Sequence, residues 1–177
     1  YLIVGMMPWN FFSTSLGGGS GSIVHQADMT KKIFFPREVL VIATVTANFI
    51  NLLITYSIVL GIVLIWRPLE HPILLFNLIL AFTTEYMFTL GISLLLAAID
   101  VYFRDVEYMT GVILMALVWM TPVMYAIEGV PVILQKILQY NPMTWYVRLY
   151  QDILYFNTLS SGVMILKCLI TGIIVLV

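Results

Sequence analysis

Long stretches without a charged side chain are the feature that most restricts how this chain can fold. A helix that crosses the hydrocarbon core of a membrane needs about 20 consecutive, mostly apolar residues. Stretches of this length occur at residues 1–27, 39–66, 71–99, 108–127 and 153–177. The third contains one charged residue, Glu85, the last contains one, Lys167, and the other three contain none. The pattern predicts a membrane protein with five spans.

Composition excludes the main alternative classes of protein. Of the 177 residues, 62% are hydrophobic and 10% are charged, whereas a soluble globular chain has about 45–50% apolar and about 25% charged residues. So few charges cannot cover a water-facing surface, and a disordered chain would need low hydrophobicity. The net charge of −1 shows no basic excess of the kind that nucleic-acid binding requires. The one cysteine, Cys168, cannot form an internal disulfide.

We therefore expect an all-α integral membrane protein, a polytopic helix bundle that forms one transmembrane domain over residues 1–177. Apolar sequence reaches both ends and the first residue is not Met, so we interpret the chain as a fragment of a longer protein. The predicted spans are about residues 1–24, 40–66, 73–99, 108–126 and 161–177.

The distribution of basic residues predicts which connections face the cytoplasm. Connections between successive spans alternate sides, and cytoplasmic loops carry an excess of Lys and Arg. The first and third connections hold Lys31, Lys32, Arg37 and Arg104, and the second and fourth hold Arg67, Lys136 and Arg148. The three basic residues of the first connection lie close together, which favours a cytoplasmic position for the first and third connections.

The predicted outer connection, residues 127–160, contains two short amphipathic segments. Apolar residues recur at helical spacing on both sides of Asn141 and Pro142, which together break a helix. Neither segment is long or apolar enough to span, so we expect two helices that lie at the outer interface or dip into the membrane and return. Trp145 and Tyr146 suit the interface because amphipathic aromatic rings favour the headgroup region.

The glycine-rich run at residues 17–22 does not have the sequence of a phosphate-binding loop, because the chain contains no Gly-Lys pair. We interpret it as a small-residue face that lets helices approach closely, with Gly17 and Gly21 four residues apart. Bending of this helix during a transport cycle is the alternative.

Two predicted cytoplasmic segments carry clusters of charge. The first connection, residues 25–37, is either an ordinary basic loop or a short surface helix that docks another protein through an aromatic and cationic patch. In the second cluster, residues 100–107, Asp100 and Arg104 are four apart and suit pairing on one helical face. We interpret this cluster, with Asp105, as a corner between two spans in preference to a metal or catalytic site, because no His or Cys lies nearby.

Glu85 lies near the middle of the third predicted span, where an ionisable side chain is costly and usually faces a bundle interior or water. Two roles stay open, one in a substrate pathway or dimer seam and one as a locally hydrogen-bonded structural residue. Aromatic faces stack on sugar rings and suit a wide path for sugars, although ordinary packing explains each ring singly. The path candidates are Trp9, Phe12, Tyr56, Glu85, Trp119, Tyr125, Trp145 and Tyr146.

Five landmarks, taken in order, resemble one known family. They are Gly5–Ser13 (GMMPWNFFS), Lys31–Leu40 (KKIFFPREVL), Asp100–Val106 (DVYFRDV), Thr121–Tyr125 (TPVMY) and Asn141–Met143 (NPM). Together they are similar to the permease subunit of type-2 ABC transporters, in the branch that exports lipid-linked polysaccharides such as O-antigen, capsule or teichoic acid. The resemblance covers essentially the whole chain.

This resemblance implies a multi-pass transport subunit of the bacterial cytoplasmic membrane, with five of the family's six spans present and no catalytic residue or metal. Two permease subunits work with two ATPase subunits, which bind ATP and magnesium, so no cofactor is expected in this chain. The implied partners are the ATPase, a second copy of the chain and the lipid-linked glycan, and no nucleic acid. The family's coupling helix falls at about residues 25–37, and its expected ATPase contacts are Gln26, Asp28, Lys31, Lys32, Phe34, Phe35 and Arg37.

Three other functions stay open at this point. A type-2 ABC permease for drugs, haem or small lipids would share the same architecture. A multi-span glycosyltransferase or acyltransferase would need a carboxylate or His cluster at one membrane face, and only residues 100–107 come close to one. A structural scaffold is the third, and the features of Glu85 and of the first connection disfavour it.

Overall fold

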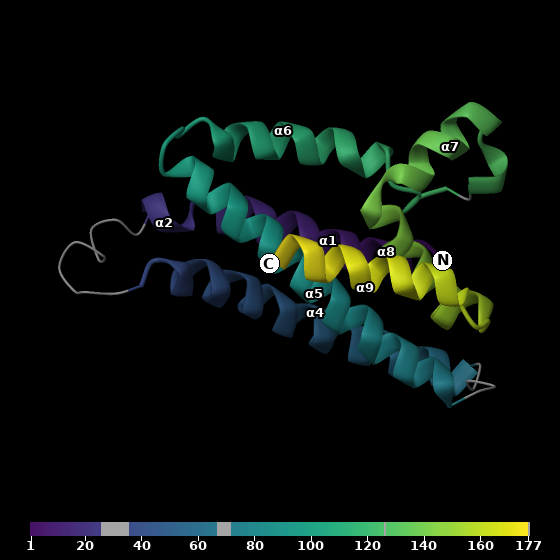
Figure 1. The fold of residues 1–177 in the computed structure, drawn as a ribbon. Helices are drawn as coiled ribbons and strands as arrows, with labels where there is room; N and C mark the ends of the chain where they lie inside the picture. The colour runs from purple at the N-terminus through teal and green to yellow at the C-terminus, as the bar shows by residue number, and fades with distance from the viewer. Residues whose placement is uncertain (26–35, 67–71, 126, 177) are drawn as a thin grey trace.

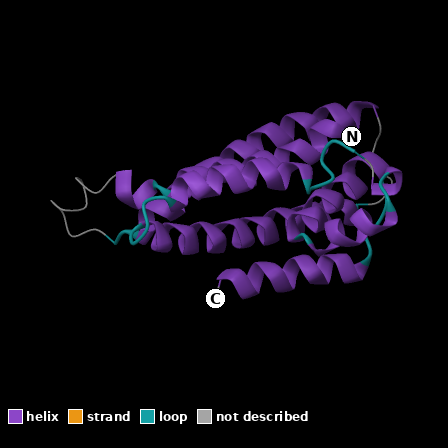
Figure 2. Cartoon of the chain, turned by 90° about the horizontal axis from the view of Figure 1, so that it is seen from above, coloured by secondary structure: helices purple, strands orange, loops and turns teal. Residues whose placement is uncertain are grey.

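The computed structural model describes residues 1–25, 36–66, 72–125 and 127–176, and within these ranges the chain forms helices and turns without a strand (Figure 1, Figure 2). The prediction of an all-helical chain is confirmed for this part. The elements are α1 (Leu2–Ser20), α2 (Ser22–His25), α4 (Glu38–Trp66), α5 (Ile73–Asp100), α6 (Val106–Trp119), a 3₁₀ turn (Ile127–Gly129), α7 (Val132–Tyr140), α8 (Pro142–Gln151), a π-helical turn (Asp152–Phe156) and α9 (Gly162–Leu176).

The two longest helices, α4 and α5, follow the predicted bounds closely. By length and composition both can cross a membrane, and each contains an apolar segment of 28 residues. At about 1.5 Å per residue such a helix extends about 42 Å, which exceeds the roughly 30 Å of hydrocarbon core. The apolar helices α6 and α9 are shorter. The number of membrane crossings stays a prediction.

Helix α6 ends at Trp119, several residues before the predicted limit at residue 126. A turn follows because Pro122 disfavours a helical conformation in the residue before it. The Asn141 side chain holds this turn, since its amide donates to Thr121 Oγ1 at 3.0 Å. The charge-free stretch in the sequence therefore overstates the length of the helix.

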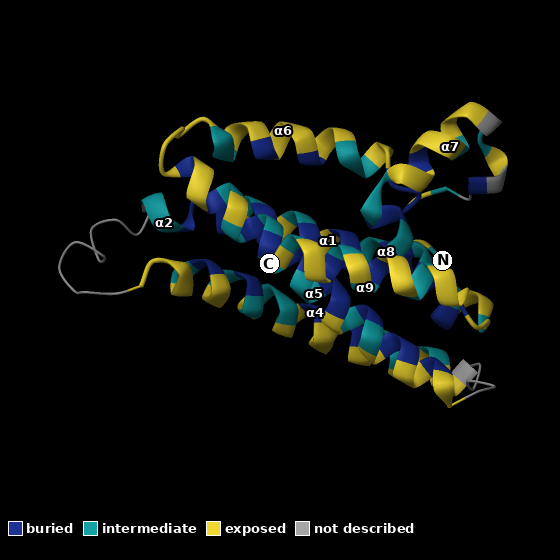
Figure 3. Ribbon diagram, in the orientation of Figure 1, coloured by how far each residue is buried: buried dark blue, intermediate teal, exposed yellow. Residues whose placement is uncertain are grey.

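The central element of the bundle is α1, which packs against α4, α5, α6 and α8 (Figure 1). Its large side chains form much of the core: Trp9, Phe11 and Phe12 are each less than 5% exposed. Helix α4 differs, because much of its surface is exposed (Figure 3). Ile54 and Ile58, one turn apart, are 56% and 60% exposed, which gives α4 an apolar outer face that suits contact with lipid.

Glycines allow α1 and its continuation to approach two neighbouring helices. A Cβ atom added to Gly19 would lie 3.1 Å from the Cβ atom of Ser93 in α5, and one added to Gly21 would lie 2.7 Å from the carboxylate of Glu107 in α6. The predicted small-residue face is therefore present. Gly17 is not part of it, because a Cβ atom there would have nothing within 4 Å.

Helices α5 and α9 also meet through glycines. A Cβ atom added to Gly91 would collide with the carbonyl oxygen of Val175, and one added to Gly172 would lie 2.9 Å from the carbonyl oxygen of Thr84. Both contacts involve backbone atoms, which cannot rotate away. The spacing of these two helices is therefore set by the absence of a side chain at two positions.

The two predicted outer helices are present as α7 and α8, which meet at Asn141. The Asn141 side chain caps α8, because its oxygen accepts the Met143 N–H at 3.1 Å. Helix α8 is mostly buried and packs against α1, α5 and α9. Helix α7 stays at the surface, with Ile133 76% and Tyr140 85% exposed. The sequence left open whether these helices lie at the surface or dip inward. Helix α8 dips into the bundle and α7 does not.

Candidate functional site

The segment predicted to couple to an ATPase lies mostly outside the described residues. Arg37 is described, and it is exposed in the turn that precedes α4. Helix α2 and the start of α4, which flank the segment, lie at the same end of the bundle as the corner between α5 and α6 (Figure 1). The predicted contacts that fall outside the described ranges are Gln26, Asp28, Lys31, Lys32, Phe34 and Phe35.

The corner between α5 and α6 is held by a buried carboxylate. Asp100 is 1% exposed, and its Oδ1 accepts the backbone N–H of Glu107 in the first turn of α6 at 3.2 Å. A negative charge at this place is favoured by the dipole of α6. The partner of Asp100 in the structure is thus the backbone of α6 and not the predicted Arg104, which is exposed together with Asp105. Among the described residues no three His, Cys, Asp or Glu side chains gather as metal ligands would.

Glu85 is fully buried in the middle of α5. Its Oε2 accepts the hydroxyl of Tyr150 in α8 at 2.6 Å, and its Oε1 has no hydrogen-bond partner within the described part of the chain. The rings of Tyr56 and Phe82 pack on Tyr150 at centroid distances of 5.1 and 5.5 Å. These contacts favour the locally hydrogen-bonded role of the two that the sequence left open.

Tyr146 attaches the other side of α8 to α9. Its hydroxyl donates to the Cys168 carbonyl at 2.8 Å and lies 3.1 Å from Thr171 Oγ1. The side chain is 0% exposed, so it is not an interface anchor as the sequence suggested. Together Tyr146 and Tyr150 fix α8 between α9 and α5.

The eight path candidates separate by burial. Five of them are less than 5% exposed, namely Trp9, Phe12, Tyr56, Glu85 and Tyr146. These side chains pack within the chain, as when Phe12 stacks on Phe88 at a centroid distance of 5.9 Å. Trp119 is 70% exposed, and Tyr125 and Trp145 are half-buried. A place in a substrate path stays a prediction for all eight.

Trp145 links the three helices α7, α8 and α9. Its indole N–H donates to the Gln139 carbonyl of α7 at 2.8 Å, and the Lys167 Nζ atom of α9 lies 5.2 Å from the ring centroid. A cation above an aromatic face is attracted to it. The contact therefore gives the one charge of the last apolar stretch a defined place.

Asp152 begins the π-helical turn between α8 and α9. Burial raises the pKa of its carboxyl group, while the hydrogen bond from Ser160 at 3.3 Å and the charge of Arg148 act in the opposite direction. The Asp152 carbonyl accepts the Thr158 N–H at 3.0 Å. Asn157 completes the turn in a left-handed conformation, with φ of 54°. Asp152 thus holds the turn through both its side chain and its backbone.

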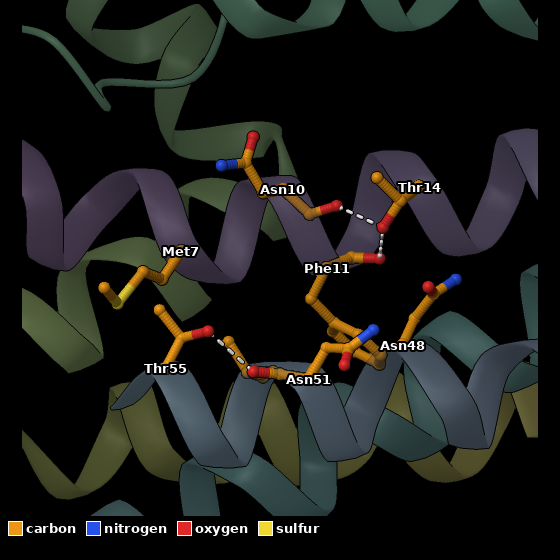
Figure 4. Close-up of a pocket in the computed structure, with 8 residues that line it drawn as sticks. Met7, Asn10, Phe11, Thr14, Asn48, Asn51 and Thr55 are labelled. Atoms are coloured by element: carbon orange, nitrogen blue, oxygen red, sulfur yellow. Dashed lines mark hydrogen bonds between the residues drawn. The ribbon is translucent and has the colours of Figure 1, made fainter. Parts of the chain in front are cut away.

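An uncharged polar groove lies between α1 and α4 (Figure 4). The cavity measures about 240 Å³. The polar residues of this groove are uncharged, so the patterns of charged and aromatic residues in the sequence did not predict it. The signal that was available is the spacing of polar residues on one face of each helix. The polar residues that line the groove are Asn10, Thr14, Asn48, Asn51 and Thr55.

These features define a helical bundle with an apolar outer face, a buried outer helix and a polar groove. Residues 1–155 match the model of the family described as ABC-2 type transporter. The chain therefore belongs to the ABC-2 type transporter family, which confirms the resemblance carried by the five sequence landmarks.

Three relatives have the name O-antigen export system permease protein RfbA. The protein of Myxococcus xanthus is 32% identical over 166 residues, which cover 92% of this chain and 63% of that protein. Two proteins of Klebsiella pneumoniae are 25% and 26% identical over 160 and 174 residues, which cover 90% and 98% of this chain. The chain thus spans between 62% and 67% of the length of these relatives.

Proposed function

We propose that this chain is the membrane-spanning core of a permease subunit that exports lipid-linked polysaccharide of the O-antigen, capsule or teichoic acid type. The subunit lies in the bacterial cytoplasmic membrane, crosses it several times and works in an ATP-driven type-2 ABC transporter. The observation that carries the proposal is the 32% identity to an O-antigen export permease over 92% of this chain. The exposed apolar face of α4 supports a membrane setting.

Energy comes from a separate ATPase subunit. The chain has no Gly-Lys pair of a phosphate-binding loop, so it is proposed to act as a transport subunit and not as an enzyme. ATP binding closes the ATPase pair, and the segment at about residues 25–37 transmits that movement to α2 and α4, which flank it. Transport then follows from a bistable arrangement of helices that contacts the ATPase differently in its two states.

Two copies of the permease form the transporter, with the path for the glycan at their seam. The exposed Trp119 and the half-buried Tyr125 and Trp145 are the aromatic candidates that remain accessible on the surface of one copy. The five buried candidates would reach the glycan only through a rearrangement of the bundle.

The alternatives separate on cargo and on chemistry. A drug or small-lipid permease would have the same fold, so only the transported molecule distinguishes it. A glycosyltransferase or acyltransferase would need the carboxylates at residues 100–107 free for catalysis. Asp100 is instead buried and bonded to the backbone of Glu107, which favours transport.

A crosslinking experiment tests the proposed partner. A photo-crosslinking amino acid replaces Lys31 in the full-length protein, in its native cells, and captured proteins are identified by mass spectrometry. We expect an ABC ATPase, and its loss when Phe35→Ala and Arg37→Ala are combined. The same amino acid at Ile58, on the exposed apolar face of α4, is the matched control and should capture no ATPase.

Deletion of the gene tests the proposed cargo in parallel. Export of glycan predicts that surface polysaccharide disappears and that lipid-linked glycan accumulates inside the cell. Capture of no ATPase at Lys31 in correctly inserted protein would remove the transporter assignment. Capture of an ATPase with unchanged surface polysaccharide would leave a type-2 ABC permease for another cargo.

A further inference from the structure

The end of the bundle that carries α7 (Figure 1) has two adjoining cavities lined by basic residues. One of about 220 Å³ lies between α8 and α9, and a wider one of about 650 Å³ lies beside it against α7. They adjoin because Gln139, Trp145 and Lys167 line both. Arg148 lines the first and Lys136 the second, and among the described residues neither lining includes an Asp or Glu. We refer to the two cavities together as the basic cavity.

The positive charge of the basic cavity is only partly balanced within the described part of the chain. Arg148 lies close enough to Asp152 for its charge to act on that carboxyl group. Lys136 and Lys167 are exposed and form no ion pair with another described residue. The Lys167 Nζ atom lies 5.2 Å from the centroid of the Trp145 ring, which orients the ammonium group without neutralising it. The cavity therefore attracts an anion.

A buried hydroxyl group at the same place lacks a partner. Thr144 lines the cavity between α8 and α9 and is 1% exposed, and its Oγ1 atom has no hydrogen-bond partner among the described residues. Buried polar groups are normally satisfied by protein, water or a ligand, because an unsatisfied one is costly. A hydroxyl, an ammonium and a guanidinium group all donate to an anionic oxygen. The lining thus supplies several donors, and an anion that bears acceptor oxygens would satisfy them.

An apolar stripe on α9 starts at the basic cavity and indicates what carries the anion. Val163, which lines the cavity, is 63% exposed, and Leu166 and Ile170 are 56% and 46% exposed. Their spacing of three and four residues places them on one helical face. A basic pocket between helices suits the phosphate of an anionic lipid, and the stripe suits its acyl chains. We propose that the basic cavity binds the phosphate headgroup of an anionic membrane lipid whose chains lie along this face of α9. The inference does not depend on which cargo is exported.

Native mass spectrometry of the full-length protein, released from detergent micelles, tests the proposal. Phosphatidylglycerol or phosphatidylcholine with the same acyl chains is added, and the dissociation constant of the bound lipid is measured. We expect phosphatidylglycerol, which has a net negative charge, to bind at least about ten-fold more tightly. Lys136→Gln combined with Lys167→Gln should weaken that binding by at least about ten-fold. Arg104→Gln, at an exposed position in the corner between α5 and α6, is the matched control and should leave it unchanged.

Three outcomes overturn the proposal. Equal affinity for the two lipids, or wild-type affinity in the double variant, means that no anionic lipid occupies the cavity, as when a second copy or another segment of the full-length protein fills it. Displacement of phosphatidylglycerol by excess inorganic phosphate makes free phosphate the ligand. Thr144→Val keeps shape and charge and should weaken phosphatidylglycerol binding about five-fold, so it repeats the measurement if the lysine variants lower the yield of folded protein. Unchanged binding in Thr144→Val is the third contrary outcome.

Discussion

Replacement of Tyr150 by Phe is expected to destabilise the bundle through a single buried carboxyl group. The Tyr150 hydroxyl donates to Glu85 Oε2 at 2.6 Å, and Glu85 Oε1 has no partner among the described residues. Phe retains the ring that packs on Tyr56 and Phe82, so the substitution removes the hydrogen bond alone. A buried polar group left without a partner costs about 1–3 kcal/mol. The upper part of this range applies, because neither oxygen of the carboxyl would then be bonded.

A double-mutant cycle isolates this hydrogen bond from packing. Glu85→Leu alone leaves the Tyr150 hydroxyl buried without its acceptor, so it also destabilises. Replacing both partners by apolar groups is nearly neutral in favourable cases. The double variant should therefore be more stable than the two single effects predict when added, with a coupling energy of about 1–3 kcal/mol.

The assay is the free energy of unfolding of the full-length protein in mixed micelles, titrated with SDS and followed by circular dichroism. Tyr140→Phe is the matched control, because Tyr140 is 85% exposed on α7 and surface substitutions usually change stability by less than about 0.5 kcal/mol. If the effects of the two single substitutions add within about 0.5 kcal/mol, the hydrogen bond between Tyr150 and Glu85 does not stabilise the bundle. A Tyr150→Phe variant as stable as the Tyr140→Phe variant would lead to the same conclusion.

Three further perturbations probe other parts of the bundle. Gly91→Ala should lower the unfolding midpoint, because the added Cβ atom would collide with a backbone carbonyl of α9. The expected cost is about 1–3 kcal/mol. Gly61→Ala is the control and should not lower the midpoint, because a Cβ atom there has nothing within 4 Å. Asn141→Ala removes both the cap of α8 and the hydrogen bond to Thr121 and should cost about 1–2 kcal/mol in the same assay. Burial raises the pKa of the Asp152 carboxyl group, so the folded protein binds a proton there more tightly than the unfolded protein does. The protonated carboxyl group therefore adds to stability at low pH, and this added stability is lost as pH rises through the pKa of the folded state. Asp152→Asn should remove that decline when unfolding midpoints are compared from about pH 4 to about pH 8; a wild-type decline that persists in the variant would exclude Asp152 as its source.

The order and type of the helices were predictable from the sequence because charge-free stretches directly determine where long apolar helices form. The early end of α6 could not be predicted from the sequence, because the turn that follows it is held by Asn141, a residue about 20 positions further along the chain. The partner of Glu85 was equally hidden, because Tyr150 lies 65 residues away. The groove required knowledge that Asn10 and Asn51, which lie on two different helices, line the same cavity. Each miss concerns a contact between distant segments, which periodicity within one segment does not report.

Helix α5 is bonded both to the start of α6 and to α8. Helix α5 ends at Asp100, in the corner beside α6, and in its middle it holds α8 through Glu85 and Tyr150. Because the Tyr150 hydroxyl is bonded to Glu85, a shift of α5 along or across its 28-residue length either carries α8 with it or breaks that hydrogen bond.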